Sequence, residues 1–162
     1  MAATADIAEE TPLQDDVRRL IGELNEALLE LTPAEYCYHM TVEEMAEPET
    51  TLFVGRIDGD AVAIGAFKRH SGPAAEVKRM YTRPEAQGNG IGGKILERIE
   101  ALAAKENYQE LVLETGDKHP AAWRVYERAG FERCGAVLDY EDTGYSIFYR
   151  KPLTAAATDQ QN

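Results

Sequence analysis

Cysteine, histidine and tryptophan are scarce in this chain: its 162 residues include two cysteines, three histidines and one tryptophan. Cys37 and Cys134 lack the CxxC spacing of redox and zinc motifs, and no paired histidines accompany them. We therefore expect reduced, buried thiols and no metal site. No apolar run approaches the ~18 residues of a membrane span, and a charged-then-apolar secretory start is missing. These absences favour a cytoplasmic protein without a membrane partner.

Positive charge is also in deficit, since 17 lysines and arginines face 29 aspartates and glutamates and leave a net charge of −12. Affinity for nucleic acid comes largely from phosphate neutralisation, so this balance argues against a nucleic-acid partner. An acidic surface suits a cationic or neutral acceptor better. The length fits one domain with a real core, and a hydrophobic fraction of 44% is ordinary for a globular protein.

Hydrophobic periodicity gives a coarse order of helices and strands. Apolar residues recur at helical spacing from Val17 to Leu31 and predict an amphipathic helix that ends before Pro33. A capping-box signature at 41–44 predicts a short second helix. Residues 51–57, 61–68 and 75–82 indicate a strand meander, with a hairpin turn at 58–60. The other expected elements are a weak strand at 5–10, helices at 91–107 and 120–130, and strands at 110–114, 131–137 and 146–151.

A glycine-rich loop precedes the helix expected from residue 91. Four glycines in six positions remove side chains from the turn, so backbone N–H groups can face an anion at the positive end of the helix dipole. A pyrophosphate-bearing cofactor is the natural ligand, although a glycine-rich turn without a ligand is the alternative. The loop consists of Gln87, Gly88, Asn89, Gly90, Ile91, Gly92 and Gly93.

Three phosphate-binding patterns compete for these glycines. A P-loop requires Ser or Thr after Gly93-Lys94, and Ile95 stands there, so this pattern is excluded. The dinucleotide pattern G-x-G-x-x-G is formally matched, and Glu114 follows about 20 residues later. Against it, five residues separate the strand from the first glycine, and a meander precedes the loop instead of a βαβ unit. The third pattern, Gln/Arg-x-x-Gly-x-Gly/Ala, is matched by residues 87–92.

Residues 76–96, which include this third pattern, resemble the acetyl-CoA-binding core of the GCN5-related N-acetyltransferase (GNAT) superfamily. Downstream, residues 122–131 resemble the second signature of that family, A-x-x-x-Y-x-x-x-G-F, and the similarity extends over about 51–153. The resemblance implies a single α/β domain at 1–153, with a mixed, mostly antiparallel sheet of about seven strands flanked by about four helices. The small, polar residues 154–162 are expected to form a disordered tail.

The resemblance also assigns the cofactor, acetyl-CoA. It places the thioester carbonyl at backbone N–H groups of Met80, Tyr81 and Thr82, where the family splays this strand from its neighbour. It places the pyrophosphate at backbone N–H groups from Gln87 to Lys94. We expect one or two nearby cations to contact phosphate, from the candidates Lys78, Arg79, Arg83, Lys94 and Lys118.

Catalytic roles follow from the same resemblance. Tyr126 stands where the family carries a tyrosine near the CoA sulfur, and a phenol can protonate a thiolate; a buried structural tyrosine is the alternative. His119 replaces an asparagine that often contacts the cofactor, and we favour a helix cap or a cofactor contact over catalysis. Glu76 is the first candidate for the base, and Glu114 or solvent are the alternatives, because either carboxylate could simply form a strand-end ion pair. No Ser-His-Asp or Cys-His constellation stands out, so the amine is expected to attack the thioester directly.

The acceptor is expected to be a primary amine of a small molecule or a peptide. Aromatic candidates for its pocket are Tyr36, Tyr38, His39, Tyr140 and Tyr145. Residues 113–116 and 139–153 resemble a bacterial subgroup labelled as indole-acetate acetyltransferases, within the bacterial small-molecule and protein acetyltransferases. A non-catalytic CoA-binding module and, less favoured, a dinucleotide-binding protein are the alternative functions. A homodimer is left open.

Overall fold

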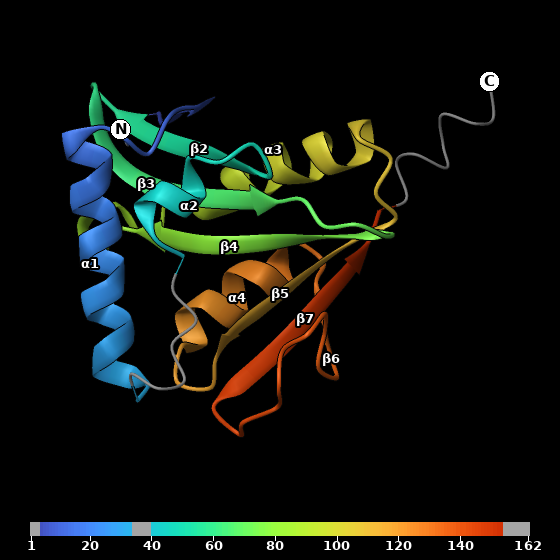
Figure 1. Cartoon of the computed structure of the whole chain (residues 1–162). Coiled ribbons are helices and arrows are strands. Elements are labelled where there is room, and N and C mark those ends of the chain that lie inside the picture. Colours follow the sequence, from blue (N-terminus) through green and yellow to red (C-terminus); the bar gives the residue numbers. More distant parts are fainter. Residues whose placement is uncertain (1–3, 34–39, 154–162) are drawn as a thin grey trace.

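The computed structural model describes residues 4–33 and 40–153, and within them seven strands form one sheet in the order β1-β2-β3-β4-β5-β7-β6 (Figure 1). The strands are β1 (Asp6–Glu9), β2 (Thr50–Ile57), β3 (Asp60–Lys68), β4 (Ala74–Thr82), β5 (Glu110–Gly116), β6 (Glu132–Cys134) and β7 (Ser146–Pro152). The helices are α1 (Asp15–Leu31), α2 (Val42–Met45), α3 (Ile91–Lys105) and α4 (Pro120–Arg128), with a 3₁₀ turn η2 (Pro84–Ala86).

Pairing within the sheet is antiparallel except between β4 and β5, which are parallel. This confirms the expected mixed, mostly antiparallel sheet of an α/β domain, and the described chain has the expected four α-helices. A meander of antiparallel strands precedes the glycine loop, and β4–α3–β5 is the single parallel crossover of the described sheet, whereas a dinucleotide fold repeats such βαβ units in a mostly parallel sheet.

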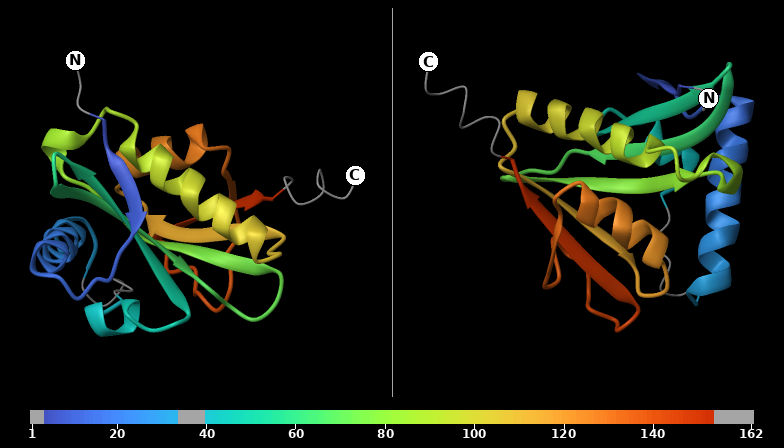
Figure 2. Two further views of the ribbon diagram at one scale, coloured as in Figure 1. Left: turned by 90° about the horizontal axis from the view of Figure 1, so that it is seen from above. Right: turned by 180° about the vertical axis from the view of Figure 1, so that it is seen from behind.

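Helices cover both faces of the sheet, with α1 and α2 on one side and α3 and α4 on the other (Figure 2). The apolar stripe of α1, including Val17, Leu20 and Leu24, packs on β2 and β3 in one core. The other core lies under α3 and α4 and contains Ile95, Ile99 and residues of β2, β3, β4, β5 and β7. The helix α1 ends at Leu31, as Pro33 predicted, and the capping box of α2 forms between Thr41 and Glu44.

The central strand β4 carries an irregularity that shapes the sheet. Ala66 pairs with Lys78 but Ile64 pairs with Tyr81, so β4 has one extra residue at this point. Arg79 sits in this bulge with φ +57°, a left-handed conformation that is rare for a non-glycine residue. Val77 and Met80 face the core under α3, whereas Arg79 contacts Asn25 of α1.

The strands β4 and β5 pair only at their first residues. The parallel ladder consists of Ala74–Glu110, Ala75–Leu111 and Glu76–Val112, after which the strands diverge (Figure 1). The splay that the family resemblance implied for this strand is therefore present. It opens a gap in the middle of the sheet. On the side that faces this gap, the described backbone of β4 and of β5 has no paired strand.

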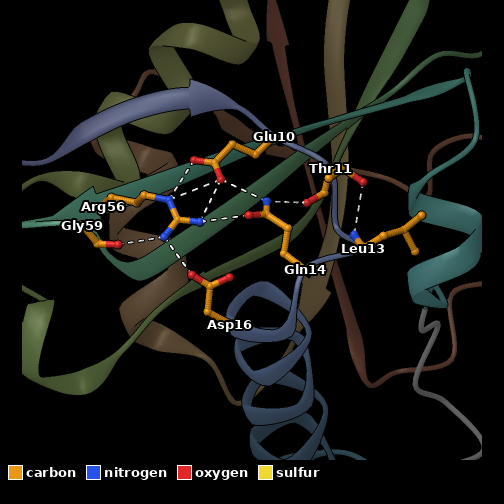
Figure 3. A network of polar contacts seen from close by, with 7 residues as sticks. All are labelled: Glu10, Thr11, Leu13, Gln14, Asp16, Arg56 and Gly59. Carbon is orange, nitrogen blue, oxygen red and sulfur yellow. Dashed lines mark hydrogen bonds and ion pairs between the residues drawn. The ribbon is translucent and has the colours of Figure 1, made fainter.

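Arg56 of β2 ties the N-terminal elements to the sheet (Figure 3). Its guanidinium donates to both Glu10 oxygens at 2.8–3.2 Å, to Asp16 Oδ2 at 2.8 Å and to the Gly59 carbonyl at 2.8 Å. These bonds lower the pKa of the Glu10 and Asp16 carboxyls. One side chain thus joins the end of β1, the start of α1 and the β2–β3 turn.

Three expectations need correction or fall outside the description. The strand expected at 131–137 is limited to β6, because the Tyr140 N–H closes a turn on the Val137 carbonyl and Leu138 has φ +53°. Cys134 is a free thiol, but it is only partly buried. Cys37, the pocket candidates Tyr36, Tyr38 and His39, and the expected tail at 154–162 lie outside the described residues.

Candidate active site

A pocket of about 90 Å³ lies where β4 and β5 diverge. The helix α1 borders one side of it, and α4 contributes from the other face of the sheet. It gathers three candidate catalytic residues, Glu76, Glu114 and Tyr126, which come from β4, β5 and α4. Its full lining is Leu24, Leu28, Thr32, Glu76, Val77, Lys78, Arg79, Met80, Glu114, Thr115, Gly116, His119 and Tyr126.

Glu76 is buried, with 2% of its surface exposed, at the end of the short β4–β5 ladder. One carboxylate oxygen lies 2.8 Å from His70 Nε2. The other accepts the Tyr140 hydroxyl hydrogen bond at 2.5 Å and lies 3.4 Å from Lys78 Nζ, which itself donates to the Tyr140 hydroxyl at 2.6 Å. The ion pair of Glu76 with Lys78, considered from the sequence, is thus present.

His70 and the Glu76–Tyr140 contact were missed from the sequence. His70 follows β3 by two residues, and the register pairs Lys68 with Glu76, so a hairpin alignment could have placed the histidine near the carboxylate. Tyr140 is 64 residues from Glu76, and nothing local indicates that contact. A second pocket of about 430 Å³ lies beside this cluster, lined by Lys68, His70, Glu76, Leu138, Asp139, Tyr140 and Glu141. Glu76 borders both pockets.

Glu114 of β5 has a different environment. Burial raises the pKa of its carboxyl, and a hydrogen bond of 2.7 Å from Ser146 Oγ to Oε2 opposes this shift. Its other oxygen accepts no hydrogen bond within residues 4–33 and 40–153. A partly desolvated carboxylate with one free oxygen is suited to accepting a proton near neutral pH.

Tyr126 is 6% exposed and its ring packs between Phe131 and Tyr149, at centroid distances of 6.0 and 5.8 Å. Burial, followed by the charge of Glu114, raises the pKa of the phenol. Within the described part of the chain its hydroxyl forms no hydrogen bond, although the residue lines the pocket. A protonated phenol without a protein partner at this pocket can donate its proton to a ligand.

His119 takes the N-cap position of α4, where its carbonyl accepts from the Trp123 N–H, although its side chain makes no capping hydrogen bond. The imidazole packs closely on Gly116. A Cβ added at Gly116 would lie only 2.4 Å from Cδ2 of His119. Its Nε2 is buried and has no hydrogen-bond partner among the described residues, and burial lowers the pKa of the ring. His119 therefore presents a neutral imidazole at the pocket.

The glycine loop is exposed and leads into α3. Gly88 and Gly90 have φ of +87° and +76°, which glycine adopts without strain. The side chains of Gln87 and Asn89 brace the loop through bonds of 3.0 Å to the Thr82 carbonyl and 3.2 Å to the Ala86 carbonyl. Gly90 caps α3 without a side chain, so no side-chain acceptor occupies the first N–H groups of the helix.

The loop faces open space. A Cβ added at Gly88, Gly90 or Gly93 would meet no atom within 4 Å, so these positions border open space that side chains would fill. No acidic residue lies in the first turn of α3 to repel an anion. Gly92 differs, because its Cβ would lie 3.3 Å from Val125, and it serves helix packing. Ile91 is buried, and Lys94 is exposed one turn into the helix.

The remaining candidates are distributed unevenly. Met80 lines the pocket. Tyr81 and Thr82 do not line it, and both pair with β3. Of the five cations, Lys94 and Lys118 are exposed, Arg83 pairs with Glu23 at 3.0 Å, Lys78 pairs with Glu76, and Arg79 is buried. Tyr140 borders the second pocket, and Tyr145 borders neither. The described residues contain no cluster of metal-binding side chains, and no described helix is long and apolar enough to cross a membrane.

Comparisons with known proteins agree with this geometry. Residues 17–131 match the model of the acetyltransferase (GNAT) family. The chain is 38% identical over 148 residues to an IAA acetyltransferase of Azospirillum brasilense, across 91% of this chain and 97% of that protein. It is 31% identical over 104 residues to the N-acetylaspartate synthetase of Rattus norvegicus, across 64% of this chain and 35% of that protein. A solved structure from Klebsiella pneumoniae, described as an acyl-CoA N-acyltransferase, superposes with a TM-score of 0.80 at 28% identity, over 94% of this chain and 99% of that one.

Proposed function

The chain belongs to the acetyltransferase (GNAT) family and is an N-acetyltransferase, and we propose that it transfers the acetyl group of acetyl-CoA to a primary amine without an acyl-enzyme intermediate. One observation carries the proposal: the β4–β5 gap brings Glu76, Glu114 and Tyr126 to one pocket, as direct transfer requires. The amine nitrogen forms a bond to the carbonyl carbon, the carbon–sulfur bond breaks, one proton leaves the amine and one reaches the thiolate.

The glycine loop would hold the pyrophosphate of acetyl-CoA. Support comes from the two left-handed glycines, the open space in front of them and the uncapped N-terminus of α3. The positions from Gln87 to Lys94 contribute backbone N–H groups, and Lys94 supplies an exposed cation. His119 would contact the cofactor end that enters the pocket, since its side chain is part of the pocket lining.

The thioester carbonyl would accept from backbone N–H groups at the β4 bulge. At the bulge the backbone of β4 leaves its regular pairing with β3, and the splay separates the same part of β4 from β5. Met80 lies at the pocket, and Tyr81 and Thr82 continue the strand beyond it. Fixed N–H donors at the site where negative charge develops are typically among the largest catalytic contributions.

Tyr126 would protonate the departing thiolate, since its hydroxyl is protonated and has no hydrogen-bond partner among the described residues. Glu114 is the better candidate for the base, in place of Glu76, which the sequence favoured. Burial raises the pKa of the Glu114 carboxyl toward the working pH, and one of its oxygens is free. Both oxygens of Glu76 already interact with His70, Lys78 or Tyr140, so Glu76 would organise the acceptor side of the site.

Calorimetric titration and an acceptor screen test the proposal together. Acetyl-CoA and CoA should bind to the purified protein, and NADH should not. A panel of primary amines should release free thiol from acetyl-CoA with at least one acceptor. Tight binding of NADH, or binding of neither CoA form, would refute the assignment of the glycine loop. CoA binding with no thiol release across a broad panel would leave a non-catalytic CoA-binding module.

A carboxylate exchange separates the two candidate bases. Glu114→Gln should lower kcat by about 10²-fold and remove the acidic limb of its pH profile, as expected when a general base is lost. Glu76→Gln should act mainly on KM for the amine, because it disturbs the contacts with His70 and Tyr140. The reverse pattern would return the base to Glu76.

A further inference from the structure

Arg79 is a buried cation whose charge is not balanced. Only 7% of its surface is exposed, and within residues 4–33 and 40–153 no carboxylate forms an ion pair with it. Its Nη2 donates to the neutral Asn25 Oδ1, and its Nε is buried and has no partner in the part of the chain that the structure describes. Burying an ion without an opposite charge costs several kcal/mol, so buried arginines are normally paired.

The acidic residues of this region make other contacts, and none of them pairs with Arg79 within the described residues. Glu23 of α1 accepts from Arg83 and Tyr81, Glu76 pairs with Lys78 and His70, and Glu114 accepts from Ser146. Burial alone shifts the pKa of the Arg79 guanidinium, to about 10, so it remains charged at neutral pH. The charge is thus retained in a place where the described protein offers no anion to neutralise it.

The backbone also holds Arg79 in this position at a cost. Its φ of +57° is strained for a residue with a Cβ, and backbone strain of this kind clusters at functional sites. The bulge turns the side chain toward Asn25 and α1, away from the core that Val77 and Met80 enter. Arg79 also borders the pocket that contains Glu114 and Tyr126.

We propose that Arg79 binds a carboxylate of the acceptor, so that the amine substrate is an amino acid. Its guanidinium offers donors in a fork that matches a carboxylate, and only one described contact uses them. With the carboxylate held at Arg79, the amino group would lie in the pocket that Glu76 and Glu114 also line. Asn25 orients the guanidinium without neutralising it. This inference rests on the proposed N-acetyltransferase activity and names its substrate class.

Matched acceptors and three variants test the assignment. Each amino acid of a panel is compared with its carboxamide, and kcat/KM is measured from thiol release. In the wild type, the carboxylate form should be preferred by at least about tenfold, as expected for a charge-assisted bond. Arg79→Met should abolish this preference, and Arg79→Lys should retain part of it. Arg83→Met is the control, because Arg83 is a paired arginine on the same segment and should leave the preference intact.

Asn25→Asp gives a second test that does not depend on Arg79 variants folding. The change is nearly isosteric and places a carboxylate beside the guanidinium, so it should raise the thermal stability and raise KM for the carboxylate acceptors much more than for the carboxamides. An unchanged KM for the carboxylate form, or a wild type that acetylates carboxamides equally well, would overturn the role of Arg79. Those results would leave the acetyltransferase activity standing, whereas a lack of thiol release with every acceptor would count against that activity itself.

Discussion

Replacing Tyr126 by phenylalanine removes a single oxygen and tests the proposed acid directly. The ring keeps its contacts with Phe131 and Tyr149, and no protein hydrogen bond is lost, because the hydroxyl has no partner in the described residues. The free energy of unfolding should therefore stay within about 1 kcal/mol of the wild type, or rise. The rate should behave differently. Loss of general-acid assistance should lower kcat by about 10²-fold, which corresponds to about 2.7 kcal/mol of transition-state stabilisation.

Single-turnover thiol release is the appropriate assay, since product release can limit kcat at steady state. The affinity for acetyl-CoA, measured by calorimetry, should change little. Because the pKa of the Tyr126 phenol is raised, the wild-type hydroxyl stays protonated and the ratio of the two rates should be constant between about pH 6 and pH 9. A Tyr126→Phe enzyme with full single-turnover activity would refute the acid role and make Tyr126 a core residue. A large loss of stability would show that the hydroxyl has a partner.

Three further predictions concern the loop, the carboxylate of β5 and the N-terminal ion pairs. Gly90→Val should weaken acetyl-CoA binding more than tenfold, and Gly59→Val, with a similar φ of +87° in open space, should lose stability but not affinity; equal affinities for the two variants would refute the cradle. Glu114→Gln should raise the melting temperature at pH 7.5 but not near pH 4. Because the carboxyl pKa is raised in the folded state, its contribution to stability is present below pH ~4.5 and is lost as the pH rises through the folded pKa. A gain in melting temperature that does not depend on pH would contradict this reasoning. Arg56→Met should lower the urea-derived free energy of unfolding by about 1–3 kcal/mol at pH 7, and the difference should shrink as the pH falls through the lowered pKa of Glu10; a constant difference would mean that packing dominates.

Local pattern was sufficient to predict most elements of the fold. The apolar stripe of α1, the capping box at Thr41 and the hairpin turn around Gly59 each act within a few residues, so the sequence shows them directly. The family resemblance implied a mixed, mostly antiparallel sheet of about seven strands, which periodicity alone would not give, whereas the order of the strands came from the structure. The end of β6 was mispredicted because a left-handed residue, Leu138, and a turn override the apolar pattern there.

The candidate site was predictable where its residues follow from strand position. Glu76 and Glu114 were placed on adjacent strands from the sequence, and both reach one pocket with Tyr126. The bulge at Arg79 was not predictable, because it depends on how β4 packs between β3 and α1. Tyr140 was named only as a possible pocket residue, and its contact with Glu76 spans 64 residues of sequence.

Because β4 and β5 share a ladder of only three residue pairs, hydrogen exchange should be faster along their diverging edges than in the paired parts of the sheet. Beyond that ladder the two halves of the sheet are joined mainly through the core under α3, so amides along the diverging edges have few barriers to exchange with solvent. A ligand that enters the gap would contact both halves of the sheet. It would stabilise the folded state in proportion to the logarithm of its concentration over Kd. Amides of β4 after Glu76 and of β5 after Val112 should therefore exchange much more slowly when acetyl-CoA is bound, while those of the β1–β2 pair should change little.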